Sequence, residues 1–198
     1  MKLRIATLFV LLMVTVNSYG NSVTFTDTTT ASGTIGSISF SNDPITILAI
    51  GNTSSRQMFS QGFFINVSSA SITIGGLGTF QFTTGTRFFV NNTFQTVGFS
   101  RSGLSGADLI DGPVNSAFSS WSMLTSLGPI TGGGAIFQWD SRFPPVLTNG
   151  GTLVLNNASP NVTFSARVSP VVPEPSTFLL LGTGLFGIVG AMRRKLLG

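Results

Sequence analysis

The sequence predicts an all-β protein: a single antiparallel β-sandwich, jelly-roll-like or related, with an N-terminal signal-peptide helix and a C-terminal transmembrane helix. In the middle of the chain, apolar and polar residues alternate with a period of two, and clusters of Gly and Asn interrupt them roughly every ten residues. The 18 Phe residues, nearly all in this middle part, supply the bulk of a core. We therefore expect about eight to ten strands between two apolar targeting segments.

Residues 1–20 are predicted to be a secretory signal peptide. Lys2 and Arg4 form a basic start, residues 5–16 an apolar core, and Ser18 and Gly20 are small residues at the −3 and −1 positions. After export through the Sec translocon, signal peptidase would cut between Gly20 and Asn21. A permanent N-terminal anchor is the alternative, but the apolar core is too short to span a bilayer.

Residues 21–170 are predicted to form the β-sandwich domain. Alternation is clearest over residues 161–168, where Thr163, Ser165 and Arg167 lie between apolar residues. Other short strands, rich in Val, Ile, Phe and Thr, are expected at residues 45–50, 62–67, 71–74, 80–83, 87–90, 96–99, 136–139 and 152–155. Turns are expected at residues 42–44, 75–76, 91–92, 132–134, 149–151 and 156–157.

Two segments are ambiguous. Phe118, Trp121 and Leu124 have helical spacing, but the Ser-rich sequence around them forms helices poorly, and we favour a strand there. Residues 108–112 are expected to form a single helical turn.

The composition excludes most catalytic machinery. The chain has no Cys and no His, and its Lys residues, Lys2 and Lys195, lie in the targeting segments. A Ser nucleophile in residues 21–172 therefore has no His or Lys base, and common zinc, copper and haem ligands are missing. The same residues hold five Arg and five Asp, a net charge of zero, which does not favour nucleic acid binding. We expect neither an enzyme nor a cofactor.

The Asp residues are the remaining candidates for chemistry. Asp108 and Asp111, with Asp140 further along, are the closest approach to a glycosidase carboxylate pair, although an Asp in a turn usually bonds its own backbone. Asp108 and Asp111 are also the best candidates for calcium ligands, but they do not provide the set of oxygen ligands of a convincing loop. No metal site is therefore predicted.

Aromatic residues are candidates for ligand contact. Trp121 and Trp139 would suit sugar stacking if exposed, but both lie in apolar patterns that favour core packing. Arg87 beside Phe88 and Arg142 beside Phe143 resemble nucleic-acid stacking pairs only superficially.

Residues 171–198 form a tripartite tail. The motif at residues 172–176 contains Pro173, Glu174 and Pro175, whose prolines prevent a helix from starting earlier. An uncharged segment follows at residues 177–192 and is predicted to be a transmembrane helix, slightly short for the ~30 Å hydrocarbon core. Arg193, Arg194 and Lys195 begin the basic tail (residues 193–198) and would stop transfer on the cytoplasmic side. A buried helix or a plain anchor is the alternative.

This order of motif, apolar segment and basic end resembles the PEP-CTERM sorting signal, the Gram-negative counterpart of the LPXTG tail. The resemblance implies recognition and processing by exosortase, and a precursor tethered to the inner membrane by residues 177–192 that later reaches the cell surface or the extracellular space. It also implies an association with exopolysaccharide and biofilm. Residues 121–131 resemble a strand found in many proteins with such tails.

Three functions follow as hypotheses. The favoured one is an exported structural protein of the cell surface or extracellular matrix, with exopolysaccharide as a candidate partner. The alternatives are a carbohydrate-binding module and, less favoured, an Asp-dependent glycoside hydrolase.

Overall fold

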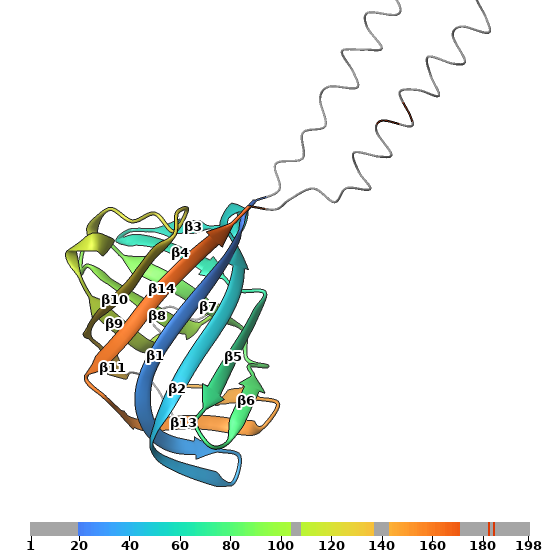
Figure 1. The fold of residues 1–198 in the computed structure, drawn as a ribbon, viewed down its shortest axis with the longest axis vertical. Helices are drawn as coiled ribbons and strands as arrows, with labels where there is room; N and C mark the ends of the chain where they lie inside the picture. Colours follow the sequence, from blue (N-terminus) through green and yellow to red (C-terminus); the bar gives the residue numbers. More distant parts are fainter. Residues whose placement is uncertain (1–19, 104–107, 137–142, 171–181, 183, 185–198) are drawn as a thin grey trace, which may run out of the picture.

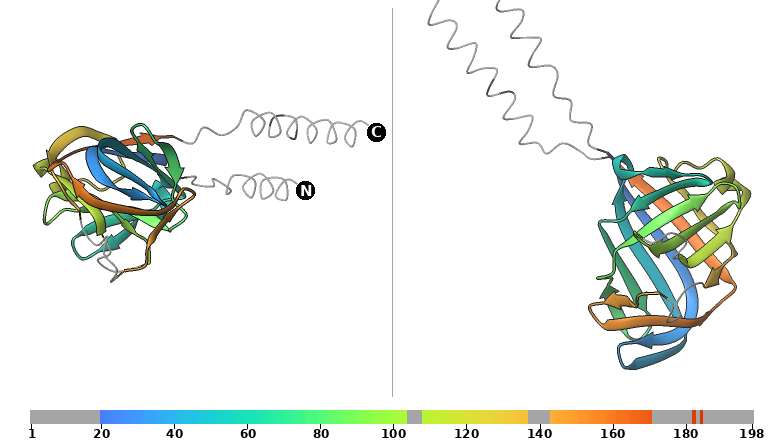
Figure 2. Two further views of the ribbon diagram at one scale, coloured as in Figure 1. Left: turned by 90° about the horizontal axis from the view of Figure 1, so that it is seen from below. Right: turned by 180° about the vertical axis from the view of Figure 1, so that it is seen from behind.

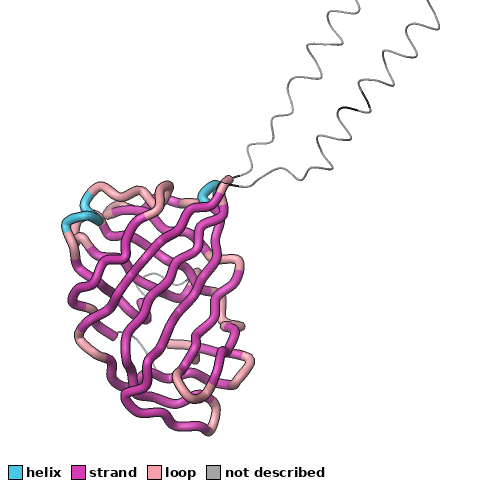
Figure 3. Tube along the Cα trace, in the orientation of Figure 1, coloured by secondary structure: helices cyan, strands magenta, loops and turns pink. Residues whose placement is uncertain are grey.

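The computed structural model describes residues 20–103, 108–136 and 143–170, together with Gly182 and Gly184. Residues 20–170, where they are described, form strands joined by turns, with two short 3-10 helices, η1 (Thr53–Ser55) and η2 (Ser116–Ser119) (Figure 3). The strands are β1 (Ser22–Ile35), β2 (Ile38–Asn52), β3 (Gln57–Phe59), β4 (Gly62–Asn66), β5 (Ser69–Ile74), β6 (Gly78–Gln81), β7 (Thr86–Asn91), β8 (Thr96–Arg101), β9 (Asp108–Val114), β10 (Leu127–Gly133), β11 (Ala135–Ile136), β12 (Val146–Thr148), β13 (Gly151–Ala158) and β14 (Asn161–Ser169).

The strands form two antiparallel sheets that face each other as a sandwich, which confirms the predicted fold class (Figure 1). The large sheet has eight strands, in the order β10-β14-β1-β2-β5-β6, with β13 also pairing with β1 and β12 pairing with β13. The small sheet has six strands, in the order β11-β9-β8-β7-β4-β3. Figure 2 shows the small sheet from behind, with its strands running across those of the large sheet.

Strand β1 is the centre of the large sheet, although no strand was predicted for its residues. It pairs with β2 on one side and with β14 and then β13 on the other, and a bulge lies between Ser32 and Gly33. The turn expected at residues 42–44 is wrong, because these residues lie inside β2. Pro44 is tolerated there because the register of β2 with β5 begins only at Ile45, and at Pro44 the carbonyl alone bonds on that side, accepting from the N–H of Gly75 (2.8 Å).

Phe side chains from both sheets build the core between them. Phe25 of β1 stacks on Phe88 of β7 with ring centroids 4.8 Å apart. Phe164 of β14 lies 6.1 Å from Phe88 and 5.7 Å from Phe118 of η2. All of these rings are fully buried, so aromatic packing joins the two sheets and covers one end of the sandwich.

Several local predictions need correction. The helical turn expected at residues 108–112 is wrong, since these residues belong to β9, which is held by pairing with β8. The turn expected at residues 156–157 is also wrong, because β13 continues through Asn156 and Asn157 to pair with β1. The strand expected at residues 121–131 forms only in its second half, as β10. The number of strands was underestimated, because several in the described part of the chain are only two to four residues long.

The two ends of the domain meet at one corner. Ser22, the first residue of β1, lies opposite Ser169, the last residue of β14 (Figures 1 and 2). The predicted signal-peptide helix and the transmembrane helix at residues 177–192 fall outside the described residues, apart from Gly20, Gly182 and Gly184. Within the described part of the chain, no helix has the length and apolar character needed to cross a bilayer.

Candidate functional sites

The junctions with both predicted targeting segments lie at the corner where β1 begins and β14 ends. The carbonyl of Asn21 accepts a hydrogen bond of 2.9 Å from the backbone N–H of Thr53. A Cβ at Gly20 would lie 2.1 Å from Oδ1 of Asn52, so only glycine fits there. Residues of the sorting motif (Pro173, Glu174, Pro175) and of the basic stop (Arg193, Arg194, Lys195) lie outside the described residues.

On the outer face of the small sheet, the strand register lines up two rows of residues, most of them polar or aromatic, across neighbouring strands. One row runs Gln57–Phe64–Phe89–Gly98–Asp111 and the next runs Asn66–Arg87–Ser100–Asp108. The opposite face of the same strands carries core residues such as Phe88 and Phe99. The period-two alternation therefore separates core from surface here, as it does in any two-layer sandwich.

Asp108 and Asp111 lie on this face together, although the sequence predicted a turn for them. Burial raises the pKa of Asp108, and the positive charge of Arg87 partly offsets that rise. Burial, with a smaller contribution from the charge of Asp108, raises the pKa of Asp111 from 3.8 to about 7. Asp111 Oδ1 is buried without a hydrogen-bond partner. The third candidate carboxylate, Asp140, lies outside the described residues.

A cleft of about 680 Å³ is hollowed into this face, and we call it the outer cleft. Strands β3, β4, β7 and β9 contribute to its lining, which includes Gln57, Phe59, Phe64, Asn66, Arg87 and Asp108. Its volume is in the range of roughly 300–1,000 Å³ that is usual for ligand pockets. Sequence reasoning missed the cleft, although Phe64 with Asn66, and Arg87 with Phe89, already have the alternate spacing of residues on one face of a strand.

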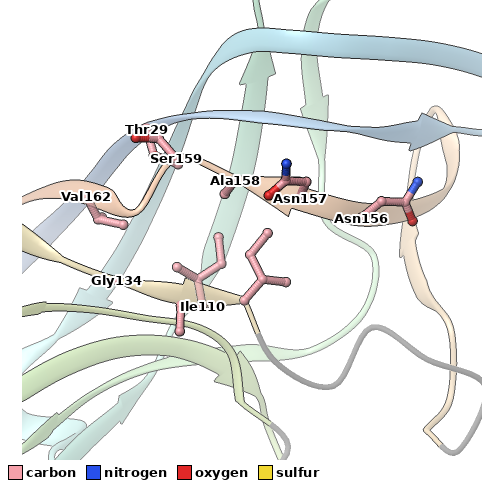
Figure 4. Close-up of a pocket in the computed structure, with 10 residues that line it drawn as sticks. Thr29, Ile110, Gly134, Asn156, Asn157, Ala158, Ser159 and Val162 are labelled. Atoms are coloured by element: carbon pink, nitrogen blue, oxygen red, sulfur yellow. The ribbon is translucent and has the colours of Figure 1, made fainter.

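A second, smaller cavity of about 240 Å³ lies at the seam between the sheets. Its side chains come from both sheets, with Ile110 on β9 facing the stretch Asn156–Ala158 of β13 (Figure 4). The hydroxyl of Thr29 donates to the carbonyl of Asn161 (2.8 Å), and that of Ser159 accepts from the N–H of Asn161 (3.2 Å). These hydroxyls stabilise the backbone, and the lining contains no charged residue among those described.

The aromatic candidates prove to be structural where they are described. Trp121 is buried against Phe118 and Phe164, and its indole N–H donates to the carbonyl of Thr125 (3.0 Å). Trp121 is therefore a core residue and not a sugar platform, whereas Trp139 lies outside the described residues, as does Arg142. Arg87 and Phe88 point to opposite faces of β7, so they do not form a stacking pair.

Asp27 is a buried carboxyl group that sequence reasoning did not single out. It follows Val23 and Phe25 on the inner face of β1, and neither carboxylate oxygen has a hydrogen-bond partner. Burial raises the pKa of Asp27 well above its ordinary value of 3.8, which favours the neutral form in the core. The period-two pattern of β1 was the signal that could have located it.

Comparison with known proteins adds one match. The family model of the PEP-CTERM protein-sorting motif matches residues 171–195. The chain carries a PEP-CTERM sorting motif. The motif marks the protein as a target of exosortase and implies export, a membrane-anchored precursor and delivery to the cell surface. No curated protein and no solved structure matches the chain.

The match leaves the β-sandwich itself without a functional assignment, because it covers only the tail. Among the described residues, no group of three or more His, Cys, Asp or Glu side chains is placed to hold a metal ion.

Proposed function

We propose that the processed protein is a non-catalytic structural component of the cell surface or of the extracellular polymer matrix, associated with exopolysaccharide and biofilm. The sorting motif carries this proposal, because it sends the preceding domain out of the cell. The meeting of Ser22 and Ser169 at one corner supports it, since a domain held by that corner leaves both sheets accessible.

A structural role is favoured over hydrolysis by the side chains available. Residues 21–172 contain no His, Lys or Cys to act as base or nucleophile. Glycoside hydrolysis needs two carboxyl groups that flank one bond. Asp108 lines the outer cleft, whereas Asp111 is not among the lining residues and has a buried oxygen. This placement supports binding or packing roles for the face rather than acid–base catalysis.

The route of the precursor completes the proposal. Signal peptidase cuts between Gly20 and Asn21 after passage through the Sec translocon, residues 177–192 hold the precursor in the inner membrane, and Arg193, Arg194 and Lys195 stay on the cytoplasmic side. Exosortase then cuts near Pro173–Ser176 and releases or attaches the domain at the surface.

The intact mass of the protein from its native host, with and without exosortase, tests this route. We expect a species from Asn21 to about Pro173, alone or with a defined adduct, only where exosortase is present. A triple variant, Pro173→Ala, Glu174→Ala and Pro175→Ala, should behave like the strain without exosortase. Pro170→Ala, which lies before the motif, should be processed normally. A mass that runs to Gly198 in every strain would refute sorting.

The matrix role is tested separately. A deletion strain should form a less cohesive extracellular matrix, and the wild-type protein should fractionate with that matrix. Release of reducing ends from matrix polysaccharide by the purified protein, lost in Asp108→Asn, would instead establish a hydrolase and refute the non-catalytic proposal.

A further inference from the structure

Two Phe rings and the Arg87 guanidinium form the floor of the outer cleft. The rings of Phe59 and Phe64 lie 6.5 Å apart at an interplanar angle of 45°, and both are only partly buried. The guanidinium of Arg87 lies 5.0 Å from the centroid of Phe64, and its Nε donates to Ser100 Oγ (2.8 Å). The Ser100 hydroxyl is fully buried and fixes the plane of the guanidinium above the ring.

Carboxamide groups surround this floor. Gln57 and Asn66 are exposed, and among the described residues neither side chain has a hydrogen-bond partner. Gln61 uses its oxygen to accept from Asn91 Nδ2 (3.0 Å), which holds the turn between β3 and β4 against β7. Each carboxamide offers both donors and an acceptor, so this lining can pair with groups that also do both, as hydroxyls do.

The charges of the cleft balance each other. Arg87 is the cation of the described lining, and its charge acts on the carboxyl group of Asp108 nearby. A polyanion would meet Asp108, and a polycation would meet Arg87. Neither kind of charged polymer would therefore meet an electrostatic potential of a single opposite sign, which is what drives the binding of charged polymers. The lining therefore favours a neutral ligand.

We propose that the outer cleft binds a neutral polysaccharide chain. The C–H faces of sugar rings pack on Phe59 and Phe64, while Gln57, Asn66, Arg87 and Asp108 exchange hydrogen bonds with the hydroxyl groups. This inference rests on the proposed function and names the polymer to which a surface-delivered domain would attach. The rings of Phe59 and Phe64 are thus the candidate sugar contacts in place of Trp121, which was a candidate from the sequence but is buried in the structure.

The position of the cleft suits a polymer. The cleft lies on the outer face of the small sheet, where its lining comes from β3, β4, β7 and β9 (the sheet is seen from behind in Figure 2). The exposed Gln57 and Asn66 lie at the β3–β4 side of the cleft, which is where a polymer would enter it.

Affinity electrophoresis and titration calorimetry of the purified full chain test the proposal. The probes are galactomannan, xyloglucan and dextran as neutral polysaccharides and alginate as a polyuronate. We expect at least one neutral polysaccharide to bind, alginate to bind more weakly, and EDTA to have no effect.

Matched variants locate the binding site. The double variant Gln57→Ala and Asn66→Ala should raise Kd at least about fivefold, because each change removes hydrogen bonds to the sugar. Gln81→Ala with Asn161→Ala is the control, since both residues are exposed and lie on the large sheet. Phe59→Ala should weaken binding further, whereas Phe94→Ala, at a residue that is 64% exposed in the β7–β8 turn, should not.

Circular dichroism confirms that each variant is folded. Failure of all three neutral polysaccharides to bind, a preference for alginate, loss of binding in EDTA, or equal losses in the cleft and control variants would each overturn the proposal. The mass measurement on the sorting route does not depend on this result, so a failed cleft and a failed sorting route can be told apart.

Discussion

The outer faces of the two sheets differ in chemistry although their inner faces are alike. On the large sheet, the outer face carries hydroxyl side chains such as Thr24, Thr26 and Thr163, which solvent reaches, with the exposed Leu48 and Ile50 beside them. On the small sheet, the outer face carries Phe89, Ser100 and Asp111 in rows where several side chains are buried.

The side chains of the large sheet's outer face are explained by folding alone, whereas those of the small sheet's outer face are not. A Thr-rich outer face satisfies β-propensity and solvation at no penalty, as in most two-layer sandwiches. The outer face of the small sheet instead holds rings, an Arg and two carboxyl groups whose pKa values are raised. Part of this face is packed, since Phe89 and Ser100 are buried, and the half-buried Phe64 and Arg87 beside them are the groups that the proposed ligand would contact.

The largest expected effect comes from the core that both sheets share. Phe164 is fully buried and contacts aromatic residues from both sheets. Phe164→Ala should lower the free energy of unfolding by about 3–5 kcal/mol, through lost transfer energy and a cavity. Urea denaturation measures this, with Phe94→Ala, at a 64%-exposed residue, as a near-neutral control. Similar losses in both variants would show that the core is not shared in this way.

The next effect probes the packed outer face of the small sheet. A Cβ at Gly98 would lie 2.5 Å from the ring of Phe89 and 2.6 Å from Asp111 Oδ1. Gly98→Ala should therefore cost about 1–3 kcal/mol by overpacking. Gly133→Ala is the matched control on the large sheet, because a Cβ there meets nothing within 4 Å. Thermal unfolding measures both variants. If Gly133→Ala lost as much stability as Gly98→Ala, the outer face of the small sheet would not be more tightly packed than the large sheet.

The sequence predicted the sandwich because period-two alternation determines which face of each strand is buried. The strand β1 was not predicted, because Thr is frequent in it and Asp27 interrupts the apolar series after Val23 and Phe25. Pairing on both sides along nearly the whole length of β1 stabilises this strand, and no local pattern reports such pairing.

The candidate site was predicted in part. Asp108 and Asp111 were singled out, but the sequence suggested a turn rather than a sheet face. The outer cleft could not be predicted, because Phe64, Arg87 and Asp108 become neighbours only through the register of four strands. The PEP-CTERM tail was recognisable because its signal is linear.

The pH dependence of stability reports on one buried carboxyl group in each sheet, Asp111 in the small sheet and Asp27 in the large sheet. The pKa of Asp111 rises from 3.8 to about 7 on folding, so the folded protein keeps a proton that the unfolded chain releases. This contribution to stability is full below about pH 4 and is lost as the pH rises towards 7. Asp111→Asn should reduce the slope near pH 6 by about 1 kcal/mol per pH unit, measured by urea denaturation across that range.

Asp27 provides the counterpart on the inner face of the large sheet. Because burial raises the pKa of Asp27 too, Asp27→Asn should remove a further part of the same slope. A slope unchanged in both single variants would show that neither carboxyl group holds its proton in the folded protein.

The smallest expected effect, at Thr163, is compared with the loss of one hydroxyl from the other outer face. On the large sheet, the hydroxyls of Thr131 and Thr163 are exposed and lie 2.7 Å apart across β10 and β14, so Thr163→Ala should cost about 0.2–1 kcal/mol. On the small sheet, Ser100 accepts from the Arg87 guanidinium in a fully buried position, so Ser100→Ala should cost more, about 1.5–3 kcal/mol. A double-mutant cycle with Thr131→Ala isolates the exposed pair. If Thr163→Ala costs as much as Ser100→Ala, the outer face of the small sheet has no special organisation, and the argument for a binding surface there loses its physical basis.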